Sequence, residues 1–274
     1  MMTQLLRHQF RSTWRTLGSV VGVIALVALV SLAAALLRLP LLGPLGQGVA
    51  TAALIGLVPV VLVVLAVDYW QTMYGREGYF TMSLPVRGRE LLAAKTLHAL
   101  LIGLLTTLLA SGGALLTLVA RARLERVPVG EALSGWWDSI GALPGGMVWL
   151  VVVGAVLYLV TLVVQVASVL SISAEGRFNH LGVGAPLIGL VVLYLVNQVV
   201  SLVAMLWIPV GVVLQGPDSG QLVARGMWGG FVEAVRTGAD PDVVGLGSLP
   251  AGVVVAALLA WWAVRSIERH TSLR

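Results

Sequence analysis

Six long apolar runs constrain this chain more than any other feature. They lie near residues 18–38, 49–67, 92–120, 147–171, 182–208 and 249–265. A helix needs about 20 residues to cross a hydrocarbon core roughly 30 Å thick, and it satisfies its own backbone hydrogen bonds there. The runs are continuous and lack the period of two that barrel strands require. The sequence therefore predicts an all-α integral membrane protein with six transmembrane helices, in a single domain over residues 1–274.

The composition agrees with a membrane protein. Hydrophobic residues make up 58% of the chain and charged residues only 11%, whereas a soluble domain of this length needs far more polar surface. Cysteine is absent, which excludes disulfides and Cys-ligated metal sites. The formal charge is +5, but the basic residues flank apolar runs instead of gathering in one polar domain. This distribution is typical of membrane topology and does not indicate a nucleic-acid partner.

The arginines and the lysine predict the orientation of the chain in the membrane. With the N-terminus inside, eleven of these residues fall in inward segments and six in outward segments. The positive-inside rule then places both termini in the cytoplasm. The first apolar run is too long for the core of an ordinary signal peptide, so we expect it to be retained as a span.

The first 17 residues have the pattern of an amphipathic helix that lies on the membrane surface. The apolar stripe comprises Leu6, Phe10, Trp14 and Leu17, and the basic stripe comprises Arg7, Arg11 and Arg15. Such a helix places its aromatic rings in the interface and leaves guanidinium groups for lipid phosphates. A simple positively charged anchor for the first span is the alternative.

Two outward segments are longer than a connection requires. Residues 121–146 contain Trp136 and Trp137, which suits an interfacial segment with its indoles at headgroup depth. Residues 211–248 contain apolar residues at intervals of about three to five, which predicts a short half-inserted or re-entrant helix within 221–238, although its glycines oppose one. Neither segment is large enough for an independent extracytoplasmic domain.

The inward region of residues 69–88 carries aromatic and charged residues close together. The cluster comprises Tyr69, Trp70, Met73, Tyr74, Arg76, Glu77, Tyr79 and Phe80. Pro85 disfavours helical geometry at Leu84 and is well suited to the first turn of the next helix. We expect a short helix parallel to the membrane, exposed for docking to a cytoplasmic partner. An interfacial loop with lipid-facing tyrosines is the alternative.

The run YGREGYFTMSLPVRGRELLAAKTLHALL, Tyr74 to Leu101, resembles the signature of bacterial ABC-2-type transporter permeases. The matching positions are Glu77, Gly78, Thr81, Leu84, Pro85, Leu91, Leu92 and Lys95, and Lys95 is the only lysine in the chain. The six spans, the amphipathic N-terminal segment and the membrane-dipping segment before the last span are also similar to the architecture of these exporters.

This resemblance implies a transmembrane subunit of an ATP-driven exporter in the bacterial plasma membrane. In such exporters two permease subunits pair, and each presents a coupling helix to a separate cytoplasmic ATPase that carries ATP and Mg²⁺. The implied coupling residues are Tyr69, Trp70, Met73, Tyr74, Arg76, Glu77, Gly78, Tyr79, Phe80, Thr81, Leu84 and Pro85. The aromatic residues would fill a groove on the ATPase, and Arg76 and Glu77 would fix its orientation.

The chain itself carries no recognisable catalytic or metal-binding motif. A GxxxxGK[ST] phosphate loop and an HExxH motif are both absent, so ATP hydrolysis is expected on another polypeptide and no metal site is expected here. The acidic residues lie outside the apolar runs, whereas ion-coupled transporters generally need a charge within the membrane. A membrane enzyme is disfavoured for the same reasons.

A few amides interrupt the predicted spans. Gln165, Asn197 and Gln198 are candidates for a translocation path that is otherwise apolar and would suit a lipid, a peptide antibiotic or another hydrophobic natural product. The alternative is structural, because amides in lipid usually bond across helices. The competing function is a non-transporting membrane anchor or sensor that recruits a cytoplasmic partner through the same inward region.

Overall fold

The computed structural model describes residues 2–37, 41–75, 78–79, 87–214, 219–238 and 240–269. Within them, six helices are long and apolar enough to cross a membrane. They are α1 (Met2–Leu36), α2 (Leu42–Tyr74), α4 (Gly88–Leu124), α6 (Gly145–Ser173), α7 (Gly184–Trp207) and α9 (Ser248–Arg269). Even α9, with 22 residues, reaches about 33 Å at 1.5 Å per residue, enough for the apolar core. The predicted all-α integral membrane fold is confirmed.

Two of these helices, α1 and α2, extend furthest beyond the apolar runs that predicted them. The predicted amphipathic helix over residues 1–17 is the first half of α1 and continues into the span without a break. Leu17 is buried, whereas Trp14 is 75% exposed. The second helix, α2, continues past its apolar run as far as Tyr74. A helix does not need apolar residues to propagate, because each added residue contributes one backbone hydrogen bond. The interfacial position of residues 1–17 stays a prediction.

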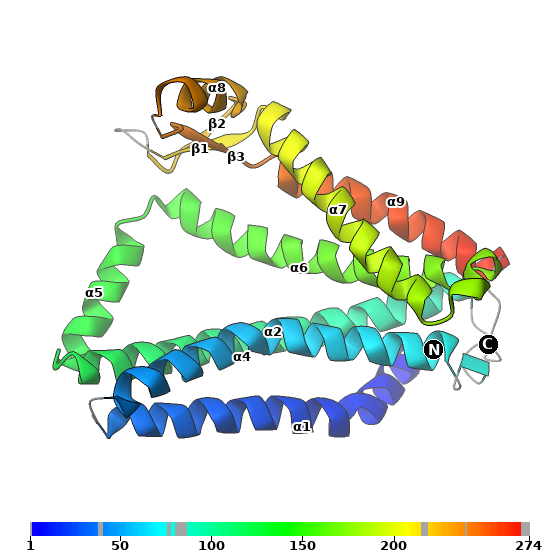
Figure 1. Ribbon diagram of the computed structural model, residues 1–274, viewed down its shortest axis with the longest axis horizontal. Helices are drawn as coiled ribbons and strands as arrows, with labels where there is room; N and C mark the ends of the chain where they lie inside the picture. The colour runs from blue at the N-terminus through cyan, green and yellow to red at the C-terminus, as the bar shows by residue number, and fades with distance from the viewer. Residues whose placement is uncertain are drawn as a thin grey trace. The chain divides into compact units, whose positions relative to one another are not determined.

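The chain forms two compact units, which are described separately. The first comprises Met1–Val86 with Glu90–Ile140, and the second comprises Arg87–Arg89 with Gly141–Arg274. In the first unit, α1, α2 and α4 are long helices (Figure 1). Among the described residues, buried apolar side chains of these helices form one cluster of Leu17, Leu57, Val61 and Leu65 and another of Leu32, Ala50 and Ala120.

Small residues let α1 and α2 approach closely in the first unit. A Cβ atom on Gly46 of α2 would overlap the backbone oxygen of Ser31 in α1. Close approach through glycine is a common way for helices to associate in a membrane. The next residue, Gln47, donates a hydrogen bond of 2.9 Å from Nε2 to the backbone oxygen of Thr117, and this contact joins α2 to α4.

The second unit is built on α6, α7 and α9 (Figure 1). Gln165 of α6 bonds to Gly252 of α9, and further along both helices Ser266 bonds to Ser171, so α6 and α9 run parallel. The 3₁₀-helix η1 (Gly176–Leu181) follows α6. Gly189 lets α7 approach α6 closely, because a Cβ there would lie 2.7 Å from Ser173 Oγ.

A small sheet with one helix beside it connects α7 to α9 in the second unit (Figure 1). The strands β1 (Gly211–Val213), β2 (Leu222–Val223) and β3 (Val243–Gly245) pair antiparallel in the order β2-β1-β3, and α8 spans Trp228–Thr237. The helix predicted within residues 221–238 therefore begins only at Trp228, and Leu222 and Val223 pair with β1 instead. Membrane insertion of α8 stays a prediction.

The predicted interfacial segment with two tryptophans forms α5 (Val129–Gly141). None of its residues is buried, and Trp136 and Trp137 are 41% and 67% exposed. Their ring centroids lie 6.2 Å apart. An unburied helix with adjacent indoles has the surface expected of an interfacial element.

Candidate functional site

The first four predicted coupling residues lie on the last two turns of α2. Tyr69, Met73 and Tyr74 are buried, and Trp70 is partly buried. The ring centroid of Tyr74 lies 6.2 Å from that of Tyr69 and 5.4 Å from that of Trp70. These side chains therefore belong mainly to the helix packing and do not form the separate exposed helix that their spacing predicted.

The remaining coupling residues fall in the connection between α2 and α4. Gly78 is buried and Tyr79 is 60% exposed, and both are helical. The positions Arg76, Glu77, Phe80, Thr81, Leu84 and Pro85 lie outside the described residues. Of the predicted docking aromatics that the structure describes, Tyr79 is the most exposed, and the docking role of the segment stays a prediction.

Lys95 lies two turns into α4 and is buried, with 4% of its surface exposed. Its Nζ donates a hydrogen bond of 2.6 Å to Thr72 Oγ1 on α2 and lies 5.9 Å from the ring centroid of Tyr69. The Thr72 hydroxyl in turn donates to the backbone oxygen of Asp68 at 2.6 Å. The sole lysine thus joins α4 to the end of α2. The sequence resemblance included this lysine, but its burial could not be predicted from the sequence.

His98 follows one turn later on the same face of α4 and is 2% exposed. The hydroxyl of Thr13 in α1 donates to the Gln9 backbone oxygen. The Thr13 Oγ1 atom therefore accepts a hydrogen bond from His98 Nε2 at 3.1 Å. Phe10 packs edge-on against the imidazole, with ring centroids 4.5 Å apart. Among the described residues, His98 Nδ1 is buried without a hydrogen-bond partner. Lys95 and His98 therefore bind α2 and α1, respectively, from one face of α4.

The predicted pathway amides divide into a hydrogen-bonded pair, of buried Gln165 and half-buried Asn197, and one exposed side chain. Asn197 Nδ2 donates to Gln165 Oε1 at 2.7 Å, and Gln165 Nε2 donates to the Gly252 backbone oxygen at 3.1 Å. Gln198 is exposed. The pair joins α6, α7 and α9, which is the structural alternative foreseen for buried amides.

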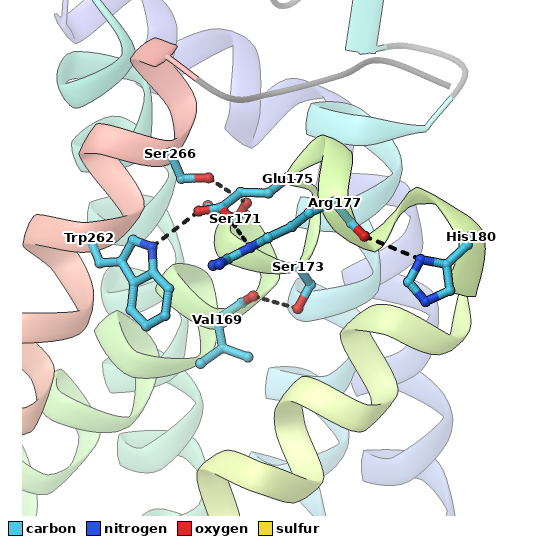
Figure 2. A network of polar contacts seen from close by, with 8 residues as sticks. All are labelled: Val169, Ser171, Ser173, Glu175, Arg177, His180, Trp262 and Ser266. Atoms are coloured by element: carbon cyan, nitrogen blue, oxygen red, sulfur yellow. Dashed lines mark hydrogen bonds and ion pairs between the residues drawn. The ribbon is translucent and has the colours of Figure 1, made fainter.

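A second polar network lies at the C-terminal end of α6, where the chain enters η1 (Figure 2). The Glu175 carboxylate is 8% exposed; its Oε1 accepts from Trp262 Nε1 at 3.1 Å and its Oε2 lies 2.7 Å from Arg177 Nε. Ser266 Oγ donates to the Ser171 backbone oxygen at 3.3 Å. Reading the sequence did not find this network, although an acidic residue directly after an apolar run was a usable signal.

The described residues hold no group of three or more His, Cys, Asp or Glu side chains that could bind a metal ion. No family model, curated protein or solved structure matches the chain. Its six apolar helices make it a multi-pass membrane protein, and its polar side chains meet mainly in contacts that join helices.

Proposed function

We propose that this chain is the permease subunit of an ATP-driven ABC exporter in the bacterial plasma membrane, with both termini in the cytoplasm. A second permease subunit, identical or similar, pairs with it, and a separate cytoplasmic ATPase binds ATP and Mg²⁺. The resemblance of Tyr74–Leu101 to the ABC-2 signature supports this proposal, as do the six spanning helices.

The observation that carries the proposal is the burial of Lys95. Thr72 lies just before the connection of residues 75–87 and Lys95 lies just after it, and a 2.6 Å hydrogen bond joins the two side chains. An ionisable side chain inside a membrane helix is costly, so its retention favours a functional role. Here the bond joins the two helices on either side of the segment that is proposed to bind the ATPase.

This arrangement suits the transmission of movement from a cytoplasmic motor. A force on the connection would move the ends of α2 and α4 together, because Lys95 and Thr72 hold them to each other. The bond between His98 and Thr13 would carry the movement to α1. Coupling of this kind passes through rigid elements that are joined by specific contacts.

The proposed substrate is hydrophobic or amphipathic, such as a lipid, a peptide antibiotic or another natural product. Few polar side chains interrupt the spans, and an apolar path favours apolar cargo. Asn197 and Gln165 are joined to each other by a hydrogen bond, so Gln198 is the pathway candidate whose side chain is exposed.

The proposal is tested by reconstituting the chain in liposomes with the ATPase that co-purifies with it. Substitution of Glu77 and Tyr79 together by Ala should lower substrate-stimulated ATP hydrolysis and transport at least tenfold, because hot-spot residues at an interface contribute about 2 kcal/mol or more. The matched control is Trp137→Ala, which removes another exposed aromatic side chain, from α5. It should leave both rates unchanged.

Full transport by a well-folded double variant would contradict the docking role of the segment. Co-purification of an ATPase without any movement of substrate would favour the anchor or sensor instead. If no ATPase binds under conditions that preserve the fold, the exporter proposal is wrong.

A further inference from the structure

Arg177 is held in a fixed orientation at the end of α6. Its Nε forms an ion pair of 2.7 Å with Glu175 Oε2, and its guanidinium carbon lies 4.7 Å from the ring centroid of Phe178 and 5.6 Å from that of Trp262. Figure 2 shows the guanidinium next to the Glu175 carboxylate and to the indole of Trp262. Contacts with a carboxylate and with aromatic rings together restrict the plane of an arginine side chain.

Most of the hydrogen-bonding capacity of Arg177 is still free in this orientation. The ion pair with Glu175 is made through Nε, and in the described part of the chain no hydrogen bond involves the two terminal amino groups. The Arg177 side chain is 55% exposed, whereas Glu175 is 8% exposed and already binds Trp262 through its second oxygen. Four N–H donors in a planar fork match the oxygens of a phosphate group.

The surroundings of Arg177 are those of a membrane interface. It follows a spanning helix by only four residues, and Trp262, with 42% of its surface exposed, is a residue type enriched at the level of the headgroups. His180 and Arg265 are also exposed and lie on η1 and α9. Basic groups between spanning helices attract anionic lipids, and the predicted orientation places this end at the cytoplasmic leaflet.

We propose that Arg177, oriented by Glu175 and Trp262, binds the phosphate of an anionic phospholipid headgroup. The terminal amino groups donate to two phosphate oxygens, and the exposed part of the indole rests at the boundary of the headgroup layer. The lipid would cover the contact between α6 and α9 at this end, so a bound headgroup would stabilise the folded second unit.

The test counts the phosphatidylglycerol molecules that remain bound to the purified full-length chain by native mass spectrometry. Phosphatidylcholine and inorganic phosphate serve as the competing probes. Arg177→Gln should remove one tightly bound phosphatidylglycerol and weaken its apparent affinity about five- to tenfold. Phosphatidylcholine should bind more weakly than phosphatidylglycerol to the unaltered chain, and phosphate at lipid-equivalent concentration should not displace the lipid.

The matched control is Arg121→Gln. Arg121 also pairs through Nε with a glutamate, Glu125, at 2.8 Å, but both side chains are exposed and no aromatic ring is recorded against Arg121 among the described residues. This variant should keep the full lipid count. Glu175→Gln with Arg177→Gln is the second test variant, because it leaves no unpaired buried charge and should still lose the lipid.

Three outcomes would overturn the proposal. The first is an unchanged lipid count and affinity in both Arg177 variants. The second is displacement of the lipid by equimolar inorganic phosphate, which would assign the site to a free anion. Equal loss of lipid in the Arg121 control would also overturn it, because the effect would then reflect net charge alone.

Discussion

Asn197 on α7 donates a hydrogen bond of 2.7 Å to Oε1 of Gln165 on α6, while the side chain of its neighbour Gln198 is exposed. Adjacent helical residues point about 100° apart, which explains why only one of the two amides reaches α6. Asn197→Leu should destabilise the protein by about 0.6 to 2 kcal/mol, because Oε1 of Gln165 loses its donor in an apolar setting. Thermal unfolding in detergent measures this difference.

Gln198→Leu is the matched control for that substitution. It also replaces an amide side chain by an apolar one, one position further along the helix, and it should leave the unfolding temperature unchanged. Equal destabilisation by both variants would show that the loss of polarity, and not the bond to Gln165, sets the stability.

Gly46 and Gly48 lie two residues apart in α2 but have different surroundings. A Cβ at Gly46 would overlap the Ser31 backbone oxygen, and nothing lies within 4 Å of a Cβ at Gly48. Gly46→Ala should therefore separate α1 from α2 and cost about 1 to 3 kcal/mol, as overpacking usually does. Gly48→Ala should be neutral or stabilise the helix by up to about 1 kcal/mol. Unfolding of the two variants side by side checks this contrast, and a tolerated Gly46→Ala would contradict the close approach.

The Thr72 hydroxyl accepts a hydrogen bond from Lys95 on another helix. The hydroxyl of Thr96, in contrast, donates within its own helix, to the backbone oxygens of Leu92 and Ala93. Thr72→Val should thus destabilise the first unit by about 1 to 3 kcal/mol, because a buried cation loses a hydrogen bond. Thr96→Val makes the same change of shape without that loss and should stay within about 0.5 kcal/mol of the original chain. If the two variants unfold alike, the bond between α2 and α4 contributes nothing measurable.

The spanning helices could be predicted from the sequence because each depends on its own residues. About 20 apolar residues in a row require a helix in a membrane, whatever they pack against. The unpredicted contacts depend on residues that are distant in sequence. Lys95 reaches Thr72 across 23 positions, Thr13 reaches His98 across 85, and Trp262 reaches Glu175 across 87.

The small sheet was missed for a related reason. Its strands have only two or three residues each, and β1 pairs with segments on both sides of α8. Strands this short carry no periodic pattern, so the apolar residues Leu222 and Val223 fitted a helical spacing equally well. Their pairing with Val212 and Gly211 is a tertiary contact that overrides local preference.

Trp261 and Trp262 are adjacent in α9, but only Trp262 has a described hydrogen bond, from Nε1 to Glu175 Oε1 at 3.1 Å. Trp262→Phe keeps an aromatic face for Arg177 and removes the donor, so it should cost about 1.5 to 3 kcal/mol, the usual contribution of a hydrogen bond to a charged group. Trp261→Phe changes a side chain that is 65% exposed and should cost little. Thermal unfolding in detergent compares them, and a larger loss in Trp261→Phe would mean that ring size, and not the bond to Glu175, stabilises this end of α9.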